Sequence, residues 1–187
     1  MSLSPVKSEI LAAMLLLDKP ERATHIAKEV EKEFPSVMMH IIGLTRMGYT
    51  ASPEKGVYAL TEKGKEALGI PEINSENAKA LLSDMPQDRA FHFYAGLGKP
   101  LSLQACGLQD FCDKIPQANS DSIGFHTSRG DFESWFKAIG DVELAKKVAL
   151  LKEKKMGEEE LRSRLTEIVK NRCIALSNVA GHAISPQ

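Results

Sequence analysis

Residues 23–68 read ATHIAKEVEKEFPSVMMHIIGLTRMGYTASPEKGVYALTEKGKEAL, and this stretch decides the fold of the first part of the chain. Apolar residues at helical spacing predict a helix over residues 23–34, with Phe34 on its buried face. The pattern breaks at Pro35, and a second helix is predicted over residues 36–48. The short break favours two helices joined by a tight turn.

Further local signals flank these two helices. Residues 5–17 repeat apolar side chains at helical spacing, and the proline at their start suits a first helical turn. After Gly48, which is expected to end the second helix, two short β-prone runs flank a turn at residues 52–56. Thr61 is then placed to cap a last short helix. The predicted order is three helices, a two-stranded hairpin and a short helix.

This order resembles the winged helix-turn-helix domain of prokaryotic transcription regulators. The segment GVYALTEKGKEAL, residues 56–68, is similar to the wing-to-helix segment of many archaeal and bacterial members. The resemblance covers about residues 5–70. It implies that the helix over residues 36–48 enters the major groove while the hairpin tip contacts the DNA backbone or minor groove. By position, it implies DNA contacts from Ser36, Met38, Met39, His40, Gly43, Arg46 and Lys55.

The residue types on this helix leave a second interpretation open. Side chains that read base edges well are Arg, Lys, Asn and Gln, and here Arg46 stands alone near the far end of the helix. Met38, Met39 and Ile42 are more typical of a surface that meets another protein. The same helix therefore fits either duplex DNA or a protein partner.

Composition limits how DNA could be bound. The chain has 187 residues, of which 43% are hydrophobic, which suits one large domain or two small ones. Its net charge is −1. Residues 1–70 hold nine basic and nine acidic side chains. Attraction of this part as a whole to phosphate is therefore weak, and any DNA contact must come from local geometry.

The cysteines and the apolar runs bear on location. Cys106, Cys112 and Cys173 form no disulfide framework and are typical of a reduced, intracellular protein. No uninterrupted apolar run predicts a transmembrane helix, and the run near the N-terminus lacks the cleavage site of a signal peptide. We expect a cytoplasmic protein with no membrane partner.

The second part of the chain follows a predicted linker. Residues 71–89 are rich in proline, asparagine and serine, and hold at most one helix. Residues 90–187 are predicted to form a mostly helical domain that opens with a β-hairpin, with strands near 90–95 and 101–105. The tail is expected to be disordered after about residue 178.

A polar stretch in this domain invites a catalytic interpretation: SIGFHTSRGDFESWFKAIGDVELAKKV, residues 122–148. Most of its charged residues have local explanations, because Asp131 and Asp141 each follow a glycine and are predicted to be helix N-caps. His126 and Arg129 have no such role. We expect Arg129 to pair with a nearby carboxylate, and His126 to be a half-buried, hydrogen-bonded histidine.

This part is also similar to an uncharacterised archaeal domain family, with no known activity, over about residues 90–176. The similarity rests on a Phe-His-x-x-Arg-Gly-Asp-Phe-x-x-Trp core. In this chain the core comprises Phe125, His126, Arg129, Gly130, Asp131, Phe132 and Trp135. A polar cluster of His126, Arg129 and Asp131 is the candidate ligand or structural site that it suggests.

Other chemistry lacks the necessary spacing. Cys106 and Cys112, with His92 and His126 as companions, do not show the pattern of a zinc site. The sequence Gly-Leu-Gly at 96–98 lacks the third glycine and the helix of a phosphate loop. We therefore predict no metal, no cofactor and no enzymatic activity.

Together these patterns predict a mainly α fold with small β elements. It would comprise a winged helix-turn-helix domain over residues 1–70 and an α-helical C-terminal domain with a short β-hairpin. The favoured function is a DNA-binding transcriptional regulator that contacts double-stranded DNA as a homodimer. The C-terminal domain would dimerise, bind a partner or sense a ligand. Two alternatives remain: a protein interaction module that does not bind DNA, or a small-ligand or enzyme domain centred on His126 and Arg129.

Overall fold

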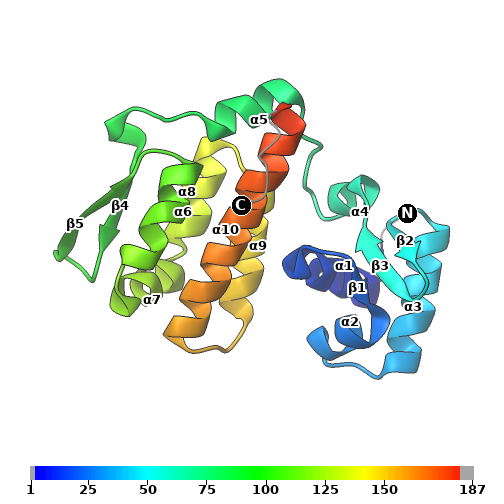
Figure 1. The fold of residues 1–187 in the computed structure, drawn as a ribbon. Coiled ribbons are helices and arrows are strands. Elements are labelled where there is room, and N and C mark those ends of the chain that lie inside the picture. The colour runs from blue at the N-terminus through cyan, green and yellow to red at the C-terminus, as the bar shows by residue number, and fades with distance from the viewer. Residues whose placement is uncertain (1–2, 182–187) are drawn as a thin grey trace. The chain divides into compact units, whose positions relative to one another are not determined.

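The structure, a computed structural model, describes residues 3–181 and forms two compact units, residues 1–72 and 73–187 (Figure 1). Helices dominate both units, and the strands form two small antiparallel sheets. The predicted fold class, mainly α with small β elements, is confirmed. No helix within residues 3–181 is long and apolar enough to cross a membrane.

Unit 1 combines four helices with a small sheet. Its elements are α1 (Pro5–Leu17), β1 (Glu21–Arg22), α2 (Ala23–Glu29), α3 (Phe34–Arg46), β2 (Thr50–Glu54), β3 (Val57–Leu60) and α4 (Glu62–Ala67). In the sheet, β3 lies between β1 and β2 and is antiparallel to both. The core combines side chains from the first three helices and β3, among them Ile10, Ile26, Ile41, Leu44 and Tyr58.

The boundary between α2 and α3 differs from the prediction. α2 ends at Glu29, and Glu31 adopts a left-handed conformation with a φ of 52°. The N–H of Lys32 then donates to the carbonyl of Ala27 at 3.0 Å, as in a Schellman turn. Phe34 begins α3 and is 45% exposed, so its predicted place on the buried face of α2 is wrong. A glutamate at the left-handed position gives no stop signal in the sequence.

The predicted hairpin is present, and a short third strand joins it. Lys55 and Gly56 form the turn between β2 and β3. β1 pairs with β3, with Glu21 opposite Tyr58, and this strand is absent from the prediction.

A cap and a glycine fix the junction between the hairpin and α4. The Thr61 hydroxyl accepts a 3.1 Å hydrogen bond from the N–H of Gly64, so the predicted cap is confirmed. A Cβ atom on Gly64 would lie 2.3 Å from the carbonyl oxygen of Tyr49. α4 can therefore approach the start of the hairpin this closely because residue 64 has no side chain.

Unit 2 is a helical assembly with a hairpin at one side (Figure 1). Its elements are α5 (Ser75–Leu82), η1 (Gln87–Arg89), β4 (Phe91–Tyr94), β5 (Pro100–Ala105), α6 (Leu108–Lys114), η2 (Ile115–Gln117), α7 (Ser120–Arg129), α8 (Asp131–Ile139), α9 (Val142–Glu153) and α10 (Glu158–Ala180). α10 packs against α5, α6, α7 and α9 and is the central helix of the unit.

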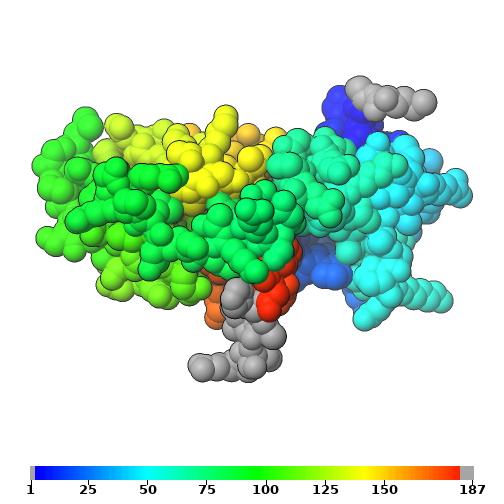
Figure 2. Space-filling model, turned by 90° about the horizontal axis from the view of Figure 1, so that it is seen from above, coloured from blue at the N-terminus to red at the C-terminus, as the bar shows by residue number. Residues whose placement is uncertain are grey.

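The stretch expected to be a linker, residues 71–89, is mostly part of unit 2. Its helix α5 packs against α10, and the hydroxyl of Ser75 donates to the carbonyl of Ala180 at 3.4 Å. In Figure 2 the red end of α10 lies beside the green atoms of this segment. α10 continues past the expected onset of disorder near residue 178, and the rest of that prediction falls on residues 182–187, outside the described residues.

α7 and α8 meet at Gly130, whose left-handed φ of 75° ends α7 as predicted. α7 is capped by the side chain of Asn119, which accepts from the N–H of Ser122. One predicted cap is wrong. Asp131 is the first residue of α8 rather than its N-cap, because its carboxylate is turned toward side chains of α7.

A buried ion network joins α9 to α10. Asp141 caps α9 as predicted, by accepting from the N–H of Leu144 at 2.9 Å. Its carboxylate also accepts from Nε of Arg172 at 2.8 Å, and Nη1 of Arg172 lies 2.8 Å from Glu143. The amine of Lys147 is 2.8 Å from the other oxygen of Glu143. All four charged residues are buried, so two cations and two anions balance each other inside the unit.

Aromatic side chains form the remaining core of unit 2 around β4. The buried rings are Phe91, Phe93, Phe111, Phe132 and Phe136. Trp135 lies at the edge of this aromatic core, where its ring stacks on Phe111 at 5.2 Å and its Nε1 donates to the carbonyl of Arg89 at 2.9 Å. Trp135 is thus half-buried, and it closes one side of the aromatic core.

Candidate functional site

The outer face of α3 carries most of the predicted DNA-contact residues of unit 1. Ser36 and Arg46 are exposed, His40 is half-buried, and Met39 is 76% exposed. Ile42 and Phe34 add two further exposed apolar side chains to the same helix. The face is therefore accessible, with an apolar centre and polar groups around it.

Met38 is the exception among these residues. It is partly buried and packs against the core of unit 1. Its sulfur accepts a hydrogen bond from the hydroxyl of Tyr58 at 3.8 Å, which ties α3 to β3. This packing directs Met38 away from the accessible face, so the side chain has a structural role.

Three cations lie on α3, beside it or at the hairpin turn; Lys63, also close to the end of α3, donates to the carbonyl of Met47. Arg46 is at the end of α3, and Lys55 is at the hairpin turn. Lys7 of α1 is the third: its amine lies 3.8 Å from the place where a Cβ of Gly43 would be, so it reaches across α3. Within residues 3–181, none of the three forms an ion pair or hydrogen bond. We call Lys7, Arg46 and Lys55 the free cations; Arg22 of β1 and Lys28 of α2 also lack such partners in these residues but are not in this group.

Elsewhere in unit 1, several cations are neutralised by nearby carboxylates. Glu21 lies 3.0 Å from Nδ1 of His25 and 3.4 Å from the amine of Lys19. Lys32 pairs with Glu9 at 3.0 Å. The hydrogen bond from His25 lowers the pKa of Glu21, which keeps this carboxylate charged. The free cations are thus set apart from these pairs by the absence of carboxylate partners in the described residues.

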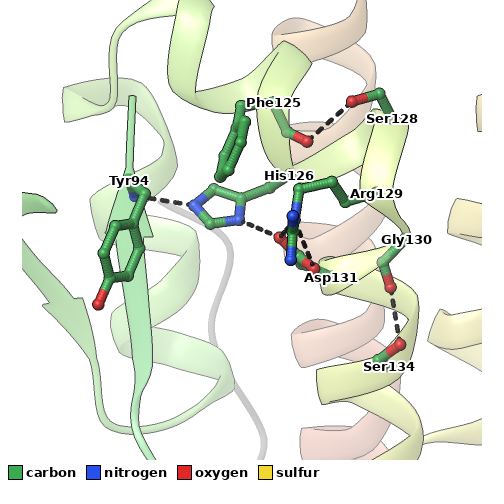
Figure 3. Close-up of polar contacts among 8 residues, drawn as sticks. All are labelled: Tyr94, Phe125, His126, Ser128, Arg129, Gly130, Asp131 and Ser134. Carbon is green, nitrogen blue, oxygen red and sulfur yellow. Dashed lines mark hydrogen bonds and ion pairs between the residues drawn. The ribbon is translucent and has the colours of Figure 1, made fainter. Parts of the chain in front are cut away.

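In unit 2, the structure brings His126, Arg129 and Asp131 together where α7 meets α8 (Figure 3). Nδ1 of His126 lies 2.8 Å from a carboxylate oxygen of Asp131. Nε of Arg129 donates to the same oxygen at 3.1 Å. On the other side of the ring, Nε2 of His126 accepts a hydrogen bond from the backbone N–H of Tyr94 at 2.8 Å. Two helices and strand β4 therefore converge on one imidazole.

This geometry assigns the protonation state of His126. Because Nε2 accepts from the amide of Tyr94, the ring proton must be on Nδ1, where it is donated to Asp131. The imidazole is only 3% exposed, and burial lowers its pKa below the usual 6.5 despite the opposing effect of Asp131. The neutral ring has no spare lone pair, so it is not placed to accept a proton from a substrate.

Arg129 differs from His126, because part of its guanidinium is still available. Its Nε bonds to Asp131, and the group lies over the ring of Phe125 at 5.1 Å. Within residues 3–181, neither Nη nitrogen of Arg129 forms a hydrogen bond or ion pair. The side chain is held in place by two neighbours while its outer edge stays open.

A cavity of about 290 Å³ lies between this cluster and the hairpin β4–β5. His126, Arg129 and Asp131 form its polar side. Its other walls come from β4, the hairpin loop and α7: Phe91, His92, Tyr94, Gly96, Leu97, Gly98 and Phe125. The sequence pattern identified the polar members and predicted the hairpin, but it gave no sign that the two meet around one cavity.

The described residues contain no group of three or more His, Cys, Asp or Glu side chains that could hold a metal ion. Cys106 is half-buried, whereas Cys112 and Cys173 are buried. Burial raises the pKa of Cys112, and it raises that of Cys173 from 9.0 to about 12. Neither buried thiol is therefore an activated nucleophile at neutral pH.

No family model, curated protein or solved structure matches the chain. The two resemblances drawn from the sequence therefore stay predictions, and the function has to be argued from the geometry of α3, the hairpin β2–β3 and the cavity of unit 2.

Proposed function

We propose that this protein is a cytoplasmic DNA-binding transcriptional regulator whose unit 1 contacts duplex DNA as a winged helix. The order α1-β1-α2-α3-β2-β3, with α3 accessible and a hairpin after it, supports this proposal. In such an arrangement a helix enters the major groove and the hairpin reaches the backbone or minor groove. A homodimer would place two copies of α3 on successive turns of the duplex.

The observation that carries the proposal is the location of the free cations. Lys7, Arg46 and Lys55 lie at or beside α3 and at the hairpin turn, without carboxylate partners in the described residues. Cations that neutralise phosphates supply most of the affinity of non-specific DNA binding. Since unit 1 has no excess positive charge, this local grouping is what would attract a duplex.

The centre of α3 would add little sequence discrimination. Met39 and Ile42 cannot form hydrogen bonds with base edges, and their apolar atoms can contact only the methyl group of thymine in the major groove. His40, half-buried on the same helix, would contact a phosphate or a base. We therefore expect modest specificity, with a preference for thymine-containing sites.

Binding of the full-length protein to a labelled random duplex, measured by fluorescence anisotropy at several salt concentrations, tests the proposal. Affinity should fall steeply with salt. Arg46→Ala and Lys55→Ala should each weaken binding and reduce the slope of log K against log salt by about 0.9 for each phosphate that the variant no longer neutralises. The single variant His40→Ala should also weaken duplex binding.

Lys19→Ala is the matched control, because it removes one positive charge from a lysine that pairs with Glu21. It should leave both affinity and slope near the wild-type values. Absence of duplex binding at low salt, or an equal loss of affinity in Lys19→Ala and Lys55→Ala, would count against DNA contact by this face.

A second function is favoured by the exposed apolar side chains of α3. Phe34, Met39 and Ile42 are 45%, 76% and 38% exposed, and exposed apolar groups that share one element are typical of protein interaction surfaces. In this alternative, unit 1 binds a protein and the duplex is not its partner.

The substitution Met39→Lys separates the two functions. On a DNA-binding face the added cation should maintain or raise duplex affinity. On a protein-binding face it should disrupt association, because a charge would replace an apolar contact. Sedimentation of the wild type and the variant, alongside the duplex titration, distinguishes these results.

A further inference from the structure

The cavity of unit 2 has apolar walls on several sides. Phe91 and Phe125 present aromatic rings to it, and Tyr94 and Leu97 contribute from β4 and the hairpin loop. Its volume of about 290 Å³ is at the lower end of the range for ligand sites, about 300 to 1,000 Å³. A compact ring fits this space better than an extended chain.

The mouth of the cavity is formed by the loop of the hairpin. Leu97 is 80% exposed and Tyr94 is 37% exposed, although both are large and lie beside an apolar space. A ligand in the cavity would cover part of both side chains. The gain from burying apolar surface, about 25 cal/mol per Å², thus favours an apolar or aromatic ligand body.

The polar side offers donors rather than acceptors. Both nitrogens of His126 are already used, one by Asp131 and the other by the N–H of Tyr94. The carboxylate of Asp131 accepts from His126 and Arg129. Within this cluster, the Nη groups of Arg129 are the remaining donors, since they have no partner within residues 3–181; His92 and Tyr94 line other walls.

The guanidinium is also held in one orientation. Its Nε bonds to Asp131, and its plane lies over the ring of Phe125. A pre-oriented guanidinium matches the two oxygens of a carboxylate with parallel hydrogen bonds, whereas a ligand amine would meet a positive charge. The geometry therefore selects a ligand that combines a small ring with an anionic group.

We propose that this cavity binds a small monocyclic aromatic carboxylate, with the ring between Phe91, Phe125 and Leu97 and the carboxylate on the Nη groups of Arg129. This site belongs to unit 2 and does not rest on DNA binding by unit 1. It makes unit 2 a small-molecule receptor in which His126 positions β4 and Asp131 positions Arg129.

Benzoate and benzyl alcohol are a suitable pair of probes, because they share the ring and differ in charge. Trp135 is the single tryptophan and its ring lies 5.5 Å from that of Phe91, a wall of the cavity. Its fluorescence in the full-length protein should report occupancy, and calorimetry should give the dissociation constants. We expect benzoate to bind at least tenfold more tightly than benzyl alcohol.

Arg129→Met should remove this preference for benzoate and leave the affinity for benzyl alcohol nearly unchanged. Lys99→Met is the control, because it removes a cation from the same hairpin loop without altering the cavity lining. Lys99→Met should keep the wild-type preference for benzoate over benzyl alcohol. Equal losses in Arg129→Met and Lys99→Met would show only a general charge effect and would overturn the proposal.

Leu97→Asp gives a second test that does not depend on the stability of the polar cluster, since Leu97 is 80% exposed. The new carboxylate at the mouth should repel benzoate and weaken its binding more than that of benzyl alcohol. The proposal fails if neither probe binds the wild type, or if both probes bind with equal affinity. Those results leave the duplex titration of unit 1 unaffected.

Discussion

The backbone N–H of Tyr94 donates to Nε2 of His126 at 2.8 Å, and this bond joins a strand edge to a helix across the aromatic core of unit 2. Among the described residues, strand β4 pairs with β5 on one side only, so an amide on its other edge needs a partner. His126 supplies that acceptor while its Nδ1–H is donated to Asp131. The imidazole therefore acts as a neutral connector between the hairpin, α7 and α8.

This role predicts a pH dependence of stability. Because burial lowers the pKa of folded His126 below 6.5, the unfolded chain takes up the proton first as the pH falls. The stabilisation is complete above about pH 6.5 and is lost as the pH falls toward the pKa of the folded state. Urea denaturation of the full chain, followed by Trp135 fluorescence, should show a lower free energy of unfolding at about pH 5.5 than at about pH 7.5, on either side of the ordinary histidine pKa.

His126→Leu should abolish much of this pH dependence and lower stability by about 1–3 kcal/mol, because the N–H of Tyr94 loses its acceptor. His92→Leu is the control, since His92 is exposed on the same strand as Tyr94. If His126→Leu kept the wild-type pH profile, the titration would have to be assigned to other groups.

The ion network of α9 and α10 predicts a large effect of one substitution. Arg172→Leu leaves the carboxylate of Asp141 buried, with no exposed surface, and without its guanidinium partner. Breaking a buried pair from one side costs about 3–5 kcal/mol. Arg164→Leu, which breaks a half-exposed pair with Glu167, should cost less than about 1 kcal/mol. Chemical denaturation of both variants checks the difference.

Two glycine substitutions in unit 1 should have opposite signs. Gly64→Ala places a Cβ 2.3 Å from the carbonyl oxygen of Tyr49, so the backbone must move, at a cost of about 1–3 kcal/mol. Gly43→Ala meets only the flexible end of Lys7 at 3.8 Å, and alanine favours the helix by about 0.5–1 kcal/mol. Thermal unfolding followed by circular dichroism measures both, and a destabilised Gly43→Ala would contradict the open surface of α3.

The thiols should react at very different rates with a disulfide reagent. Cys106 is half-buried and should react first. The shift in the pKa of Cys173 from 9.0 to about 12 lowers its thiolate fraction about a thousandfold at neutral pH, and burial adds a steric barrier. A stopped-flow assay should show one fast thiol, which Cys106→Ser removes, and two that appear only with urea. A second fast thiol in the native protein would conflict with this burial.

Local signals account for the parts of the fold that the sequence predicted correctly. The caps Thr61 and Asp141 could be predicted because each side chain bonds to the N–H only three residues later. Gly130 and Gly140 end helices because their φ values, 75° and 100°, are left-handed. Such features can be predicted from neighbouring residues in the sequence. Together with the apolar periodicity, they were enough to predict the fold class.

Features that depend on distant parts of the chain were missed. β1 exists because β3, which follows two helices later, offers it an edge. The helical pattern of α9 places Val142 inward, yet it is 37% exposed while Lys147 is buried. Lys147 pairs with Glu143 of the same helix, and Arg172 of α10 supplies the second cation that Asp141 and Glu143 need. Periodicity treats every charged residue as a surface residue, so it cannot foresee a partner on a distant helix.

The candidate site in unit 2 shows the same difference between features with local signals and features that depend on distant residues. The sequence singled out His126, Arg129 and Asp131, which lie together, but it also assigned Asp131 to a helix cap that the structure does not show. In unit 1, Lys7 was not among the predicted site residues. A signal for Lys7 does exist: a glycine at position 43 in mid-helix often marks the close approach of another group.

The hydrogen bond between Ser75 and Ala180 has a consequence for synthesis. α5 is the first helix of unit 2 to leave the ribosome, but the surface that covers it belongs to α10, which is translated last. α5 must therefore remain without its partner helix α10 while the residues between the two helices are synthesised. We expect the unit to gain its protease resistance in a single step once α10 has left the ribosome, rather than gradually as the preceding helices emerge.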